Sequence, residues 1–122
     1  MDNTILFWGK VIKGKRRGKS LGFPTANIKL HKKVTHGIYI SKAIVSQKEY
    51  FALTFIGSNK TFNEHDIKAE TYFINAKPNV YGKWLTVKLL KKIRDNKKFK
   101  STKELITQMK KDLIIAKIYF KI

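Results

Sequence analysis

Glycine and basic residues alternate in one short stretch, where Lys13 to Gly22 reads KGKRRGKSLG. Glycines allow backbone N–H groups to approach a phosphate closely, and basic side chains neutralise its charge. The glycines and basic residues that could contact a phosphate here are Gly14, Lys15, Arg16, Gly18, Lys19 and Gly22. The spacing is not that of a P-loop, because Lys13 stands where the first glycine would be needed and Pro24 interrupts the required helix. A solvated basic hairpin is the alternative that composition alone leaves open.

Two oxygen-bearing side chains follow, at Thr25 and Asn27 in the string LGFPTANI. Pro24 favours an extended conformation for the residue before it, and alternate side chains of an extended chain point to the same side. A hydroxyl and an amide carbonyl on one side are hard ligands that suit Mg²⁺. These two residues are therefore candidate metal ligands, unless they only satisfy a turn.

A single carboxylate, Glu70, lies within an apolar run. In Ala69–Ile74 the strand alternation places it on the same face as Tyr72 and Ile74. A carboxylate among bulky apolar groups is costly unless it is paired or functional, so Glu70 is a candidate functional residue. The alternative is an exposed face on which Glu70 forms a salt bridge with a lysine.

β-Branched and aromatic residues predict several strands in the first three quarters of the chain. The expected strands are Ile5–Lys13, Gly37–Val45, Tyr50–Ile56, Lys68–Ile74 and Trp84–Ile93. Breaks are expected at 46–48, 57–59 and 75–82, where Gly, Asn, Ser and Pro gather. Successive strands without intervening helices indicate an antiparallel sheet closed into a barrel.

A helix is expected to close the chain. Ser101-Thr102-Lys103-Glu104 matches a capping box. An apolar stripe at helical spacing follows, formed by Leu105, Ile106, Met109 and Leu113. This stripe is expected to pack against the barrel, and residues 1–122 are expected to form one domain.

Composition narrows the chemistry further. The chain has 27 Lys and Arg against 8 Asp and Glu, a formal charge of +19, so its expected partners are polyanions. It has no cysteine, which excludes disulfides, thiolate metal sites and Cys nucleophiles. No apolar run approaches the roughly 18 residues that a membrane span needs. We expect a cytoplasmic monomer that does not associate with a membrane.

The string RRGKSLGFPTANI, Arg16 to Ile28, resembles the signature of the bacterial and eukaryotic riboflavin kinase (flavokinase) family. Further segments resemble the same family in chain order. They are Gly37-Ile38-Tyr39, Gly57 with Thr61-Phe62, Ala69-Glu70, Val80-Tyr81-Gly82, and Ile93-Arg94 through Phe99 followed by the helix. The similarity therefore extends over nearly the whole chain.

The resemblance implies a mainly β fold, a six-stranded antiparallel Greek-key barrel with a C-terminal helix. It also implies transfer of the γ-phosphoryl group of ATP to the ribityl hydroxyl of riboflavin, with Mg²⁺, to give FMN and ADP. Glu70 would be the general base, and Thr25 and Asn27 would hold the metal and the ATP phosphate. The glycine-rich loop would fold over the nucleotide. Tyr81, Arg94 and Phe99 would help to enclose the flavin.

The sequence departs from the family pattern nearer the expected flavin end. The departures are Phe55, Lys60, Asn75, Ala76 and Asn96. The FMN adenylyltransferase module that often precedes this domain in bacteria is absent from these residues, so FAD synthesis is not expected of them alone.

The alternative function is a module of this fold that binds RNA or another polyanion, with kinase activity weak or lost. It is motivated by the +19 charge and by a basic run between Lys91 and Lys103. The sequence shows no aromatic pattern of the kind that stacks RNA bases. A solvated basic surface is therefore the favoured interpretation of the charge.

Overall fold

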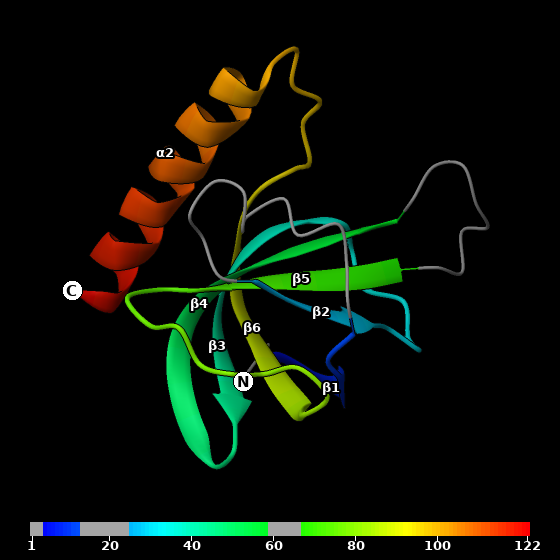
Figure 1. Ribbon diagram of the computed structural model, residues 1–122. Helices are drawn as coiled ribbons and strands as arrows, with labels where there is room; N and C mark the ends of the chain where they lie inside the picture. Colours follow the sequence, from blue (N-terminus) through cyan, green and yellow to red (C-terminus); the bar gives the residue numbers. More distant parts are fainter. Residues whose placement is uncertain (1–3, 13–24, 59–66) are drawn as a thin grey trace.

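The computed structural model describes residues 4–12, 25–58 and 67–122. Within these residues the chain forms six strands and one long helix (Figure 1). The elements are β1 Ile5–Lys10, β2 Thr25–Lys29, β3 Gly37–Val45, β4 Lys48–Ser58, β5 Ile67–Phe73, β6 Trp84–Arg94 and α2 Thr102–Phe120. The mainly β fold with a C-terminal helix that the sequence predicted is confirmed.

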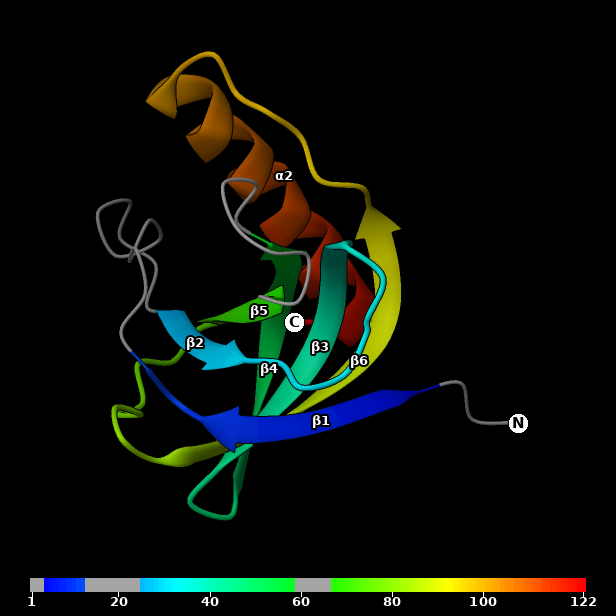
Figure 2. The ribbon, with the colours of Figure 1, turned by 90° about the vertical axis from the view of Figure 1, so that its right-hand side faces the viewer.

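The strands form one antiparallel sheet in the order β1-β6-β3-β4-β5-β2. The sheet curls so that its two edge strands approach each other (Figure 2). At this junction Ile12 pairs with Asn27 in an isolated antiparallel bridge, and the backbone N–H of Ile12 donates to the Asn27 carbonyl at 2.8 Å. Gly9 passes so close that a Cβ there would lie 3.3 Å from Cβ of Ile28. The result is a curled, partly closed barrel.

Several expected boundaries shift. The segment 25–29, expected only as extended chain, is a paired strand. The sequence places a break at Gly57, but β4 continues through Ser58 because Gly57 and Ser58 pair with Lys68 and Ile67 of β5. The first strand ends at Lys10, because Val11 hydrogen-bonds to Lys83 and Ile12 turns to Asn27.

The inner face of the sheet is filled by small and branched apolar side chains. Those with no exposed surface include Ala26, Ile28, Ala43, Ala52, Ile56, Ala69, Leu85 and Val87. Alternate residues of the same strands form a second apolar cluster on the outer face, and this cluster includes Ile38, Ile40, Leu53 and Ala116 of the helix. The sheet therefore has two apolar faces, and α2 packs on the outer one (Figure 1).

The start of α2 has one of the two hydrogen bonds of the expected capping box, because the Glu104 carboxylate binds the N–H of Lys100 instead of that of the N-cap residue Ser101. The hydroxyl of Ser101 accepts from the N–H of Glu104 at 3.2 Å, and the Glu104 carboxylate accepts from the N–H of Lys100 at 3.0 Å. The expected stripe packs inward, with Met109 buried and Leu105, Ile106 and Leu113 partly buried. Ala116 and Phe120 continue it, and the Phe120 ring stacks on Phe51 of β4.

Three buried hydroxyls cross the middle of the sheet. Oγ1 of Thr54 lies 2.8 Å from Oγ of Ser41 and 3.0 Å from Oγ1 of Thr71, and none of the three residues has exposed surface. A hydroxyl can donate one hydrogen bond and accept others, so the central Thr54 satisfies both neighbours. The chain of hydroxyls ties β3, β4 and β5 together from the inside.

We expect Thr54→Val to lower the free energy of unfolding by about 1–3 kcal/mol, because it leaves two buried hydroxyls without their shared partner. Urea denaturation followed by circular dichroism measures this loss. Thr86→Val on β6, where the side chain is half-buried and outside this chain of hydroxyls, is the control and should change stability by less than about 0.5 kcal/mol. Equal effects of the two substitutions would contradict the role given to Thr54.

Candidate functional site

The pairing of β2 with β5 brings the predicted metal ligands and the predicted base onto one surface. Asn27 lies directly opposite Glu70, and Thr25 lies directly opposite Tyr72. Directly opposed residues of antiparallel strands project to the same face with Cβ atoms about 5 Å apart. This is the outer face, because the alternate residues Ala26 and Ile28 belong to the inner core.

A cavity of about 630 Å³ opens beside Glu70, between the outer face of the sheet and α2. Its floor comes from β3, β4 and β5, and its opposite wall comes from the helix and from residues 97–101 that precede it. The apolar lining is Ile38, Leu53, Phe55, Tyr72, Phe73, Ile74, Phe99, Leu105, Met109 and Leu113. The polar lining includes Glu70, Arg94, Lys97, Lys98, Lys100 and Asp112. Such a lining suits a flat aromatic ligand with a few polar groups.

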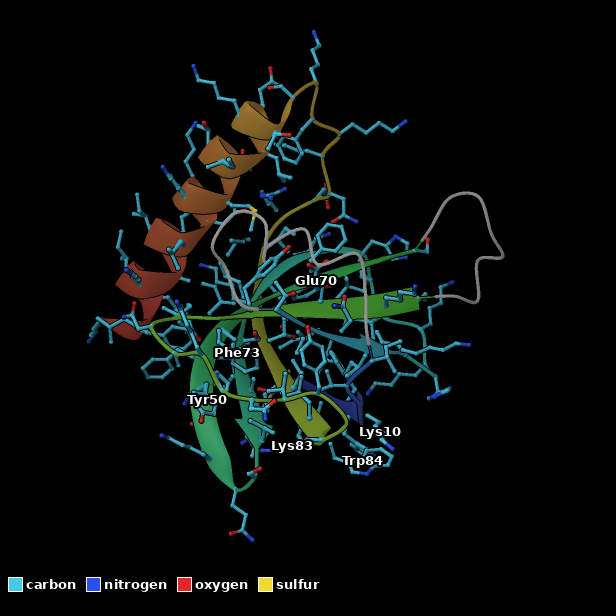
Figure 3. The ribbon with its side chains drawn as sticks, in the orientation of Figure 1. Lys10, Tyr50, Glu70, Phe73, Lys83 and Trp84 are labelled. Atoms are coloured by element: carbon cyan, nitrogen blue, oxygen red, sulfur yellow. The ribbon has the colours of Figure 1, made fainter. Side chains whose placement is uncertain are left out.

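Glu70 lies at the edge of this cavity and not at its centre. The cavity is lined by its β4 neighbour Phe55, whereas Thr25 and Asn27 on the other side of Glu70 are not part of the lining. Glu70 is half-buried as a residue with its Oε1 atom buried, and Asn27 is only 7% exposed. In Figure 3 Glu70 lies on the side of β5 that faces the helix and the residues preceding it, away from Lys10, Lys83 and Trp84. Glu70 therefore separates an apolar compartment from a strand that carries neutral oxygen donors.

The three predicted flavin-binding residues do not lie together. Arg94 and Phe99 line the cavity. Tyr81 lies in the turn before β6, at the opposite end of that strand from Arg94, and is 46% exposed. This turn adjoins the end of β1, where the N–H of Gly82 donates to the Val11 carbonyl at 3.4 Å. A role for Tyr81 in this cavity therefore has no support from its position.

The guanidinium of Arg94 is already engaged. Its Nε and Nη2 donate to the two carboxylate oxygens of Asp112 at 2.8 and 2.7 Å, and its Nη1 donates to the Asp95 carbonyl at 3.1 Å. Asp112 is 3% exposed and lies within the apolar stripe of α2. One signal for this pair is visible in the sequence, a charged residue at helical spacing between Met109 and Ala116, but it does not identify the partner.

A second ion pair, which is exposed, joins Lys92 of β6 to Asp95, the first residue after that strand. Nζ of Lys92 lies 2.6 Å from Oδ1 of Asp95. The hydrogen bond to Asp95 raises the pKa of Lys92, and the hydrogen bond from Lys92 lowers the pKa of Asp95. Both groups thus stay charged across the physiological range.

Most departures from the family pattern have an identifiable structural setting. Phe55 lies opposite Glu70 and lines the cavity, and its ring occupies the space beside Gly57 that a Cβ would enter at 2.7 Å. Asn96 donates to the Ile56 carbonyl at 3.2 Å and so fastens the segment after β6 to β4. Asn75 adopts a left-handed conformation (φ 56°) just after β5, and Ala76 packs against the core. Lys60 lies outside the described residues.

The predicted phosphate loop also lies outside the described residues. Gly14, Lys15, Arg16, Gly18, Lys19 and Gly22 all fall within 13–24. Their expected role stays a prediction. The described part of the chain resumes at Thr25, so residues 13–24 directly precede in sequence the strand that carries Thr25 and Asn27.

The donor set at β2 and β5 fits a magnesium ion only together with further ligands. Among residues 4–12, 25–58 and 67–122 no group of three or more His, Cys, Asp or Glu side chains could hold a metal. What these strands offer is one carboxylate with a hydroxyl and an amide on the same face. That set is too sparse to hold Mg²⁺ alone, but it fits an ion that keeps waters and takes its other ligands from a bound phosphate.

This chain is similar to known proteins along almost its whole length. The family model described as riboflavin kinase matches residues 1–120. A trifunctional protein of Mycoplasmoides gallisepticum is 38% identical over 115 residues, and these cover 92% of this chain and 18% of that protein. The bifunctional riboflavin kinase/FMN adenylyltransferase of Buchnera aphidicola is 35% identical over 119 residues, which cover 93% of this chain and 38% of that protein. This chain thus spans well under half the length of these relatives.

A solved structure supports the fold. Riboflavin kinase from Trypanosoma brucei superposes with a TM-score of 0.72 at 24% identity, and the match covers 97% of this chain and 78% of that one. None of these similarities supports the alternative expectation of a polyanion-binding module. Within the described part of the chain, no helix is long and apolar enough to cross a membrane.

Proposed function

Because this chain belongs to the riboflavin kinase family, we propose that it transfers the γ-phosphoryl group of ATP to the primary hydroxyl of the ribityl chain of riboflavin, giving FMN and ADP. The observation that carries the proposal is the position of Glu70. It lies between an apolar cavity of about 630 Å³ and the strand that presents Thr25 and Asn27. A phosphoryl transfer needs one binding region for the acceptor and one for the nucleotide, and the two regions must meet at the carboxylate.

The cavity is proposed to hold the isoalloxazine ring. Its volume falls within the roughly 300–1,000 Å³ of small-molecule sites. The aromatic side chains Phe55, Tyr72 and Phe99 in its wall offer apolar surface to a flat ring system. Since Glu70 stands at the edge of the cavity, the ribityl chain would extend toward it and bring its terminal hydroxyl to the carboxylate.

The phosphates of ATP are proposed to lie over β2. Thr25 and Asn27 would hold the nucleotide as its magnesium complex, in which the metal neutralises charge on the phosphate oxygens. The basic residues of 13–24 directly precede this strand and would add positive charge around the triphosphate. Thr25 and Asn27 contribute neutral oxygens, so they orient the complex without adding negative charge to a crowded anionic site.

Glu70 is proposed to act on the hydroxyl. Its carboxylate accepts the hydroxyl hydrogen bond and takes the proton as the ribityl oxygen bonds to the γ-phosphorus, while the bond to the β,γ-bridging oxygen breaks and ADP leaves. The half-buried position of Glu70 limits the water that could compete as phosphoryl acceptor.

A cytoplasmic location and a monomeric state are further proposals for this chain.

We expect Glu70→Gln to lower kcat by about 10²- to 10⁴-fold, because an amide cannot accept the proton. FMN formation is measured by chromatography at saturating ATP, Mg²⁺ and riboflavin. Glu49→Gln is the matched control, since Glu49 lies on the protein surface beside Lys42 and Lys88 and should leave kcat unchanged. A wild-type chain that forms no FMN, or full kcat in the Glu70→Gln variant, would refute the mechanism.

We expect Thr25→Val to raise the KM for MgATP by about tenfold, because it removes one oxygen donor worth roughly 1.4 kcal/mol. Riboflavin affinity, measured by the quenching of flavin fluorescence, should stay within about twofold, because Thr25 is outside the cavity lining. Thr86→Val should change neither quantity. If the substitution weakened riboflavin instead of MgATP, the assignment of the two substrates to the two sides of Glu70 would be reversed.

A further inference from the structure

A hydrogen-bonded cluster connects the end of β6 to the middle of α2. We call the side chains of Arg94, Asp112 and Gln108 the latch. Arg94 grips both oxygens of Asp112 at 2.8 and 2.7 Å, and Nε2 of Gln108 donates to Oδ1 of Asp112 at 3.0 Å. Nζ of Lys97 donates to Oε1 of Gln108 at 3.2 Å, which joins the intervening segment to the cluster.

The latch is too buried to be an ordinary surface ion pair. The side chains of Arg94 and Asp112 are 14% and 4% exposed. Removing two charges from water costs about as much as their attraction returns, so apolar residues of similar volume often stabilise a fold equally well. A bidentate arginine–carboxylate pair differs from apolar packing in one respect, because it fixes the distance and orientation of the two elements it joins.

The latch stands at the base of one wall of the cavity. Residues 95–101 carry no helix or strand and run from Arg94, the last residue of β6, to the start of α2 (Figure 1). Lys97 through Ser101 all line the cavity. Since the latch fixes β6 relative to α2, it also fixes the width of the space that this segment closes.

We propose that the latch is a positioning device for riboflavin: it holds α2 and residues 95–101 at the separation that the flavin ring requires. The inference rests on the proposed function, which places the flavin in this cavity. Arg94 then acts through Asp112, because three of its five N–H groups are committed to Asp112 and to the Asp95 carbonyl. Asp112 and Gln108 are positioning residues for the same reason.

The affinity for the nucleotide should not depend on the latch. Arg94 and Asp112 line the cavity, whereas Thr25 and Asn27 on β2 are not part of its lining. A change in the latch should therefore alter riboflavin affinity and leave MgADP affinity unchanged.

The decisive variant is Arg94→Met with Asp112→Leu, which replaces the ion pair by apolar groups of similar volume. Asp112→Asn alone leaves a buried guanidinium without its counter-charge and should unfold at lower temperature, whereas the double variant should recover the wild-type unfolding temperature. We expect the double variant to bind riboflavin about tenfold more weakly and MgADP within about twofold of wild type. If the ion pair only stabilised the fold, the double variant would regain wild-type riboflavin affinity together with its unfolding temperature.

Two further variants sharpen the result. Arg94→Lys keeps the positive charge but cannot bind the Asp112 carboxylate at two points. It should therefore still show more than half of the loss in riboflavin-binding free energy that the double variant shows. Asp95→Asn breaks the exposed pair with Lys92 on the same segment and should leave riboflavin affinity within about twofold. Equal losses in Asp95→Asn and in the double variant would overturn the inference.

Amide hydrogen exchange of residues 95–101 without ligand separates this inference from the proposed function. The double variant should exchange these amides about tenfold faster than wild type, while amides of β3 and β4 remain protected. Unchanged exchange overturns the latch whether or not the chain binds riboflavin. Failure of the wild-type chain to bind riboflavin overturns the proposed function and the flavin part of this inference, and the exchange result then decides the role of the latch in holding the wall.

Discussion

The arrangement of the site depends on the register between β2 and β5. Asn27 faces Glu70 only because these strands pair as they do, and a slip of one residue would turn Thr25 and Asn27 into the barrel and expose Ala26 and Ile28. Two features oppose such a slip. Ala26 and Ile28 have no exposed surface, and the Ile12 bridge holds the backbone of Asn27 from the other side. The packing of the inner core thus determines which oxygens reach the outer face.

The same alternation explains why the site lies outside the barrel and not within it. Within the described residues the inner face is filled by small side chains, by branched apolar groups and by the hydroxyl chain through Thr54. The outer face would be an apolar surface in contact with water if it were bare. α2 covers part of it and contacts β4 most closely, and residues 97–101 stand over what remains. The cavity is the part of this face that the helix leaves uncovered.

Local patterns predicted much of this structure. The alternation in 69–74 correctly placed Glu70 beside Tyr72, and the capping box correctly located the start of the helix at Ser101. The strand at 25–29 was foreseen only as extended chain, because its partner on β5 is remote in sequence and no turn signal joins them. Tyr81 was grouped with Arg94 by the resemblance alone, whereas an eleven-residue strand follows its turn and carries Arg94 to the other end.

Asp112 shows where the sequence stops being informative. A carboxylate on the apolar stripe of a helix requires a partner, and 27 Lys and Arg make almost any partner available. Arg94 is selected because two register shifts between β3 and β6 bring it opposite Ile38, at the edge of the outer face. A guanidinium there can reach α2 and bind the carboxylate at two points, which a lysine at the same position could not do. The two register shifts in the sheet therefore determine that Arg94 is the partner of Asp112. In our proposal this pair sets the distance between α2 and the face of the sheet that carries Glu70.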